Sequence, residues 1–286
     1  MSAKPIVAAT DGSEESLRAV EWAAREAVLR GAPLRIVSAP GLLPRMADTE
    51  DHSQYQNVSD TIRKDSDVAL SAAAERAAKV APDLLIDTDH LVGGPAEAVT
   101  ESGSGALMLV VGSRGRGAFT AMILGSVSRY AATHAASPVV VVREEIGAAR
   151  RQVGIGIGDL HGNAAALTFA FEEAALRKAS LVAVNAWHAP ESDISRAGLT
   201  TAGHAYLEDE VTRQVEELLN DWQAKYPDVP VSHDIVHGHP GRILSGLSAR
   251  ADLVVLGRHP AHHGPAAVIH AVLNHAHGPI VTVPSS

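Results

Sequence analysis

Glycine and serine recur at close spacing between positions 112 and 128, where an apolar stretch gives way to one that favours a helix. Residues 112–117 read Gly-Ser-Arg-Gly-Arg-Gly, and nine residues separate Gly115 from the Gly-Ser-Val-Ser stretch at 125–128. Glycine lets a backbone approach an anion where a Cβ would block it, and the N-terminus of the following helix adds a favourable dipole. The spacing therefore predicts a phosphate-binding loop, the alternative being a plain strand-to-helix turn.

This loop differs from the two commonest glycine-rich phosphate loops. The dinucleotide pattern lies in the first strand-to-helix turn and needs an acidic residue at the end of the next strand, whereas this loop follows the fourth predicted strand. The Walker pattern needs a lysine after its last glycine, but Ser126 follows Gly125. The loop must therefore belong to another class of nucleotide or phosphate site.

The composition excludes several classes of protein. The formal charge is −9 and no basic run exceeds two residues, so binding to nucleic acid is disfavoured. The absence of cysteine excludes disulfides, thiol catalysis and cysteine metal sites. No apolar run approaches the roughly 20 residues that span a bilayer, and residues 1–5 lead straight into a predicted strand. We therefore expect a cytoplasmic protein without a membrane anchor.

The second half of the chain repeats the first. Three pairs of similar segments occur in the same order: 23–30 with 170–177, 106–112 with 251–257, and 137–142 with 278–283. A period this long indicates duplicated domains rather than short repeats. We expect an N-terminal domain over 1–145 and a C-terminal domain over 150–286, joined by a linker at 144–150.

Each half alternates apolar strand segments with helical ones. In the first half, strands are predicted at 6–10, 34–39, 84–92, 106–111 and 138–142. Asp11 or Ser13 is expected to cap the first helix and Gly31 to end it, and a polar loop over 41–58 is expected before the second helix. Apolar residues make up 46% of the chain but aromatic residues only 3%, which favours a parallel sheet built from small aliphatic side chains. The alternation predicts an α/β fold with helices on both faces and ligands at the carboxyl ends of the strands.

The Gly-x-x-Gly, nine-residue, Gly-Ser spacing resembles the nucleotide-binding signature of the universal stress protein family, in its ATP-binding branch. The resemblance covers essentially the whole chain, and the tandem layout is similar to actinobacterial members. It implies two tandem Rossmann-like (adenine nucleotide alpha hydrolase-like) domains, each a five-stranded parallel sheet. It also implies that the last strands, 139–142 and 280–283, pair antiparallel between the domains, and that the chain forms a homodimer. The alternative for these strands is an edge covered by a loop or terminus.

The resemblance also implies roles for individual residues. Asp11, with Ala9 and Thr10 beside it, matches the opening strand and turn, where the family's aspartate meets the adenine and ribose side of ATP; a plain helix cap is the alternative. Ala39 falls where the family lines its adenine pocket. The phosphate and ribose loop is matched residue by residue by Gly112, Gly115, Gly125, Ser126, Val127 and Ser128. Its backbone amides are expected to carry most contacts, with hydroxyls of Ser126 and Ser128 as further donors.

Charge at the loop leaves two interpretations open. Arg114 and Arg116 either neutralise phosphate charge or lie solvated. Bound Mg²⁺ can accompany ATP, with Asp11 as a candidate contact.

The second half departs from this pattern. The aspartate position falls on Gly158, a required glycine is replaced by Pro260, and Ser128 corresponds to Ile269. Proline removes a backbone donor, so we expect the C-terminal domain to bind ATP poorly or not at all. The loop of this half carries His259, His262 and His263, and the helix predicted after it carries His270, His275 and His277. These histidines are either metal ligands or, in the favoured interpretation, solvated or interface residues.

Four functions remain open at this point. The favoured one is an ATP-binding regulatory protein of the stress response, with nucleotide in the N-terminal domain. No glutamate or histidine stands beside the loop to orient water, and no lysine matches the phosphate-gripping residue of kinases, so no catalytic residue is predicted. The alternatives are a nucleotide-independent interaction scaffold, a slow ATPase, and a relative of adenylating or electron-transfer flavin domains.

Overall fold

The computed structural model of the protein describes residues 3–41, 52–115, 124–143, 149–158, 164–187, 201–258 and 263–285. The chain divides into two compact units, Met1–Gly147 and Ala148–Ser286. Both are built from alternating strands and helices, as the sequence predicts.

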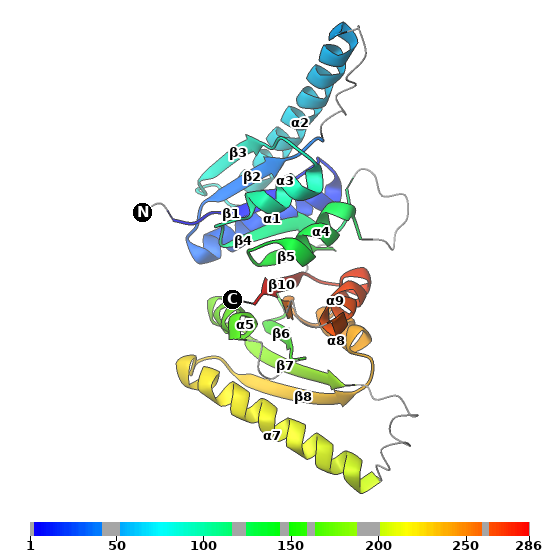
Figure 1. Cartoon of the computed structure of the whole chain (residues 1–286). Coiled ribbons are helices and arrows are strands. Elements are labelled where there is room, and N and C mark those ends of the chain that lie inside the picture. The colour runs from blue at the N-terminus through cyan, green and yellow to red at the C-terminus, as the bar shows by residue number, and fades with distance from the viewer. Residues whose placement is uncertain are drawn as a thin grey trace. The chain divides into compact units, whose positions relative to one another are not determined.

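The N-terminal unit is a parallel sheet with helices on both faces (Figure 1). Its elements are β1 (Ile6–Ala9), α1 (Glu14–Arg30), β2 (Leu34–Ser38), α2 (His52–Val80), β3 (Ile86–His90), α3 (Pro95–Ser102), β4 (Met108–Gly112), α4 (Ser126–His134) and β5 (Val139–Val142). The strand order is β3-β2-β1-β4-β5, and every pair is parallel. Helix α1 packs against α2, and α3 packs against α4.

The C-terminal unit repeats this topology. Its elements are β6 (Gln152–Gly156), α5 (Ala164–Arg177), β7 (Ser180–Trp187), α7 (Thr201–Lys225), β8 (Val231–His237), α8 (Pro240–Ser248), β9 (Leu253–Arg258), α9 (His263–His275) and β10 (Ile280–Pro284). The strand order is β10-β9-β6-β7-β8, again parallel throughout. The predicted α/β class is therefore confirmed in both units. The pairing of β5 with β10 stays a prediction.

Helix α1 begins and ends where the sequence places its signals. Ser13 is the N-cap, and its hydroxyl accepts a hydrogen bond from the Ser16 N–H at 3.3 Å. Gly31 ends the helix in the left-handed conformation, with φ of 60°, which glycine adopts without a Cβ penalty. Of the two predicted caps, Ser13 therefore fills that position, and Asp11 is left to act in the preceding turn.

The cores of both sheets are aliphatic. All four residues of β5 are buried, as are Leu109, Val110 and Val111 in β4. Alanines line the buried side of α1, among them Ala19 and Ala23, and their small side chains let the helix lie close to the strands. This close packing sets the position of the strand ends that face the candidate site.

Two boundaries differ from the prediction. Helix α2 begins at His52, inside the expected polar loop over 41–58, because residues 52–58 contain neither glycine nor proline to stop it. Helix α9 ends at His275, so His277 lies beyond it rather than on it. Its backbone N–H donates instead to the Ser248 hydroxyl at 2.9 Å.

Candidate nucleotide-binding site

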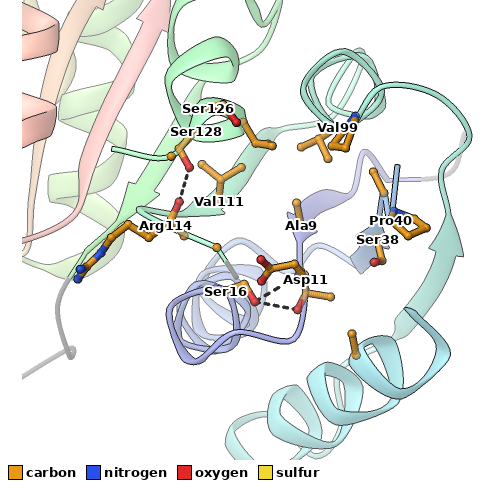
Figure 2. Close-up of a pocket in the computed structure, with 18 of the residues that line it drawn as sticks. Ala9, Asp11, Ser16, Ser38, Pro40, Val99, Val111, Arg114, Ser126 and Ser128 are labelled. Carbon is orange, nitrogen blue, oxygen red and sulfur yellow. Dashed lines mark hydrogen bonds between the residues drawn. The ribbon is translucent and has the colours of Figure 1, made fainter. Parts of the chain in front are cut away.

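A pocket of about 740 Å³ lies at the carboxyl ends of β1, β2 and β4 in the N-terminal unit, a size typical of small-molecule sites (Figure 2). Every predicted site residue that the structure describes lines it: Ala9, Thr10, Asp11, Ala39, Gly112, Arg114, Gly115, Gly125, Ser126, Val127 and Ser128. The remaining predicted residue, Arg116, lies outside the described residues. The parallel topology thus brings together segments that are more than 70 residues apart in the sequence.

The turn after β1 holds Asp11 in a fixed orientation. The Ser13 N–H and hydroxyl both donate to Asp11 Oδ1, at 3.0 and 2.6 Å. The Ser16 hydroxyl donates to the Ser13 carbonyl at 2.9 Å and lies 3.0 Å from the Thr10 hydroxyl. Because a hydroxyl has one proton, Thr10 is the donor in that pair. Figure 2 shows Asp11 beside Ser16 in the pocket wall, with its carboxylate presented as an acceptor.

Two glycines of the loop are required by the protein's own packing. A Cβ on Gly112 would lie 2.9 Å from the carbonyl carbon and oxygen of Glu15, at the start of α1. A Cβ on Gly115 would overlap the Asp11 carboxylate. Gly112 therefore allows β4 to approach α1, and Gly115 leaves room for Asp11.

Gly125 has a different environment. Its φ and ψ are −61° and 153°, which any residue adopts, and a Cβ there would have no neighbour closer than 3.5 Å. The fold therefore does not require glycine at this position. The missing side chain instead leaves the backbone open to the pocket that Gly125 lines.

The N-terminus of α4 faces the same pocket without a side-chain cap. Gly125 is its N-cap residue and makes no side-chain hydrogen bond to the helix. The backbone N–H groups of the first turn are donors of the kind that bind anions, and the helix dipole adds to their effect. The Ser128 hydroxyl, by contrast, donates to the Gly112 carbonyl at 2.6 Å and is buried, so its proton is not directed at a ligand. Ser126 is exposed at the pocket.

The arginines near the loop differ in their partners. The Arg114 guanidinium lies 3.6 Å from the Glu15 carboxylate, and Figure 2 shows its side chain pointing away from the pocket. Arg129, one turn into α4, is exposed and lines the pocket, and no carboxylate in the described part of the chain pairs with it. Arg129 was not among the residues predicted from the sequence, although its position three residues after Ser126 places both on one side of the helix.

Comparisons with known proteins agree with this architecture. The model of the universal stress protein family matches residues 2–143 and again 149–284. The chain belongs to the universal stress protein family. A universal stress protein of Mycobacterium tuberculosis (strain CDC 1551 / Oshkosh), MT2052, is 32% identical over 302 residues, which cover 96% of this chain and 93% of that relative.

A solved structure shows the same fold over the whole chain. The crystal structure of a universal stress protein from Archaeoglobus fulgidus DSM 4304 aligns with 100% of this chain and 97% of its own, with a TM-score of 0.69 and 16% identity. A universal stress protein solved in complex with cAMP aligns with 50% of this chain and 98% of its own, with 28% identity and a TM-score of 0.38. The chain is thus a tandem-domain universal stress protein with an α/β, Rossmann-like fold in each domain.

Helix α2 lines one side of the pocket. None of the residues quoted for the family resemblance lies on this helix. Its residues at the pocket are Ile62, Asp65, Ser66 and Ala69. Arg76 fixes α2 against α1 by donating to Glu14 at 2.7 Å and to Glu21. The hydrogen bond to Glu14, and next to it the hydrogen bond to Glu21, contribute most to raising the pKa of the Arg76 guanidinium. The sequence gives no signal for these pocket residues, because their place depends on how α2 packs.

Further lining residues come from β2 and α3. Ser38 and Pro40 flank the predicted Ala39, and Pro95 and Val99 belong to α3. Their position beside Ala39 at the end of β2 is the sequence signal that could have found Ser38 and Pro40. The resulting wall is mostly aliphatic, which suits a flat, partly apolar ring better than a highly charged group.

Two described positions of the C-terminal unit lack the groups that Asp11 and Ser128 supply. Gly158 stands at the position of Asp11, and a Cβ there would meet nothing within 4 Å. Ile269, at the position of Ser128, is buried and has no hydroxyl. Gly154 and Gly156 admit the leucines of α8 against β6, so their role is packing. Pro260, His259 and His262 lie outside the described residues.

Two features of the described residues concern metals and membranes. Over these ranges, no three His, Cys, Asp or Glu side chains group closely enough to hold a metal ion. Nor does a described helix combine the length and apolar character that crossing a membrane needs.

Proposed function

We propose that this universal stress protein is an ATP-binding regulatory protein of the stress response, with the nucleotide in the pocket of its N-terminal unit. The observation that carries the proposal is Gly125. It lies at an uncapped helix N-terminus, inside a pocket of suitable size, and the fold itself has no need of a glycine there. A ligand that approaches the backbone closely explains why a side chain is absent.

In this proposal the phosphates lie at the start of α4. The first-turn N–H groups would bind phosphate oxygens, and the Arg129 guanidinium, exposed at the same wall, would offset their charge. The ring system would lie toward Ser38, Ala39 and α2, where Ala39, Ile62 and Ala69 supply apolar surface. Asp11, fixed by Ser13, would accept hydrogen bonds from ribose or adenine.

Mg²⁺ is proposed as a companion of ATP rather than as a resident ion. Among the described carboxylates, Asp11 and Asp65 line the pocket, and Asp11 is the one beside the glycine loop. One carboxylate with substrate phosphates and water suits Mg²⁺, which keeps several waters when bound.

The pocket favours binding over catalysis. Its described lining contains no lysine, glutamate or histidine that could grip a γ-phosphate or orient an attacking water. Slow hydrolysis involving Asp11 and Mg²⁺ is the alternative, and it predicts a turnover that disappears with Gly115→Asp. A nucleotide-independent scaffold is the other, and it predicts no binding at all.

The test is ATP titration of the full chain by calorimetry with a pair of glycine variants. Gly125→Ala adds a methyl group that the fold accommodates but that faces the ligand, so we expect at least about a tenfold loss of affinity. Gly246→Ala, in α8, is the matched control, because a Cβ there meets nothing within 4 Å, and it should bind as the native chain does. No heat with the native chain, or equal affinity for native and Gly125→Ala, would contradict the proposal.

Location and partners belong to the same proposal. We place the protein in the cytoplasm, where ATP is abundant, without nucleic-acid partners, since the chain carries a charge of −9. We further propose that β5 and β10 pair within the chain and that the protein is a homodimer. Light scattering with and without ATP measures the assembly size.

A further inference from the structure

Three polar side chains from two elements form a hydrogen-bonded series at the α2 wall of the pocket. His90, the last residue of β3, has its Nδ1 3.0 Å from the Ser66 hydroxyl and its Nε2 2.7 Å from Asp67 Oδ1. Ser66 lines the pocket and is 4% exposed, whereas the Asp67 side chain is 58% exposed. The buried hydroxyl thus connects through His90 to a solvated carboxylate.

The Asp67 carboxylate determines which atoms of this series carry the protons. An ionised carboxylate only accepts hydrogen bonds, so Nε2 of His90 must carry the proton. In a neutral imidazole the other nitrogen, Nδ1, then accepts, and the Ser66 hydroxyl donates to it. The single proton of Ser66 is thereby used, and its oxygen is left with lone pairs only. Ser66 therefore acts toward a ligand as an acceptor and not as a donor.

The same three residue types occur in nucleophilic triads, but this arrangement does not support that chemistry. Ser66 lies in the middle of α2, where backbone N–H groups are bonded within the helix. No free donors are then left beside its hydroxyl to stabilise an oxyanion. The role that fits is recognition of a donor group on the ligand.

We propose that Asp67, acting through His90, holds Ser66 as the acceptor that recognises the exocyclic amine of adenine. This rests on the proposed function, in which the phosphates occupy the α4 side of the pocket. Figure 2 shows α2 across the pocket from Ser126, so a nucleotide with its phosphates at α4 directs its base toward α2. An amino group pairs with the Ser66 oxygen, whereas the carbonyl of a 6-oxopurine would place two sets of lone pairs against each other. Ser66 is the contact residue, and His90 and Asp67 are positioning residues.

The test compares the affinities of ATP and inosine triphosphate, which differ at this position of the ring. Calorimetry in mildly alkaline buffer should show that the native full chain prefers ATP by about tenfold. Ser66→Ala should remove most of this preference. Asp67→Asn should also reduce it severalfold while ATP still binds, because an amide both donates and accepts and no longer fixes the histidine tautomer.

The matched control is Asp60→Asn, an exposed aspartate on the same helix that does not line the pocket, which should keep the native preference. Equal affinity of the native chain for both nucleotides would overturn the inference and leave ATP binding intact. So would a preference unchanged by Ser66→Ala and Asp67→Asn, or one removed by Asp65→Asn alone, since Asp65 also lines the pocket. If neither nucleotide binds, the proposed function itself is wrong and this inference with it.

Discussion

The Ser128 hydroxyl donates a 2.6 Å hydrogen bond to the Gly112 carbonyl, which joins the first turn of α4 to the last residue of β4. Ser128 is 4% exposed, so water does not compete for this bond. The bond fixes the start of α4 against the strand edge, and with it the N–H groups that we propose to bind phosphate. Ser128 therefore positions the loop, which differs from the phosphate contact that the family resemblance implies.

Ser128→Ala should lower the free energy of unfolding of the chain by about 1–2 kcal/mol, because it leaves a buried carbonyl without its partner. ATP affinity should fall with it as the start of α4 loosens. Urea unfolding and calorimetry measure the two effects. Ser126→Ala is the control: Ser126 is exposed, so its loss should change stability by less than about 0.5 kcal/mol. Equal stability of the two variants would show that the Ser128 bond is unimportant.

The glycines of the loop should separate into a structural and a ligand-facing class. Gly112→Ala places a methyl group against the Glu15 backbone, which cannot move away without shifting α1, so we expect a loss of about 2 kcal/mol or more in unfolding free energy. Gly125→Ala should be nearly neutral in stability. Thermal or urea unfolding without nucleotide makes the comparison. Similar stability losses at both positions would contradict the assignment.

The fold was predictable because its signals are local and repeated. The apolar stretches that became β4 and β5, the Ser13 cap and the Gly31 stop each depend on a few neighbouring residues. The alternation of strands and helices predicted a ligand site at the carboxyl ends of the strands, and the family resemblance supplied the individual residues there. The first residue of the long α2 could not be predicted. Its first turns are polar, like a loop, although their residue types are also compatible with a helix.

The α2 wall and the directions of side chains were not predictable. Ser66 and His90 are 24 residues apart and meet only because α2 packs beside β3. Both Arg114, in the loop motif, and Arg129, outside it, line the pocket, but the Arg114 guanidinium turns toward Glu15. Spacing identifies which segments meet. It does not say which way a long, flexible side chain points.

Arg129 should matter for phosphate binding and Arg114 should not. Arg129→Ala is expected to weaken ATP binding severalfold and adenosine binding hardly at all, because the lost charge acts on the phosphates. The effect should shrink as salt concentration rises, since exposed charges are screened. Arg114→Ala is the matched variant and should leave the ratio of ATP to adenosine affinity unchanged. Calorimetry measures the affinities for ATP and adenosine at low and high salt. Equal effects of the two substitutions on the ratio of these affinities would contradict this assignment.

ATP binding should depend on the aspartate after the first strand in the N-terminal unit, and not on the equivalent position of the C-terminal unit. Asp11→Asn keeps an oxygen that can accept from the Ser13 N–H and hydroxyl, so the turn should persist. It removes the charge and the second acceptor, and we expect about a tenfold loss of ATP affinity if ribose or adenine donates there. Gly158→Asp, at the equivalent position of the C-terminal unit, has open space for its side chain and should leave both affinity and stoichiometry unchanged. Calorimetry should give one nucleotide per chain in the native protein and in Gly158→Asp. Tighter ATP binding by Asp11→Asn would instead mean that Asp11 repels the phosphates. Two nucleotides per native chain would show that the C-terminal unit binds ATP although it has neither this aspartate nor the hydroxyl of Ser128.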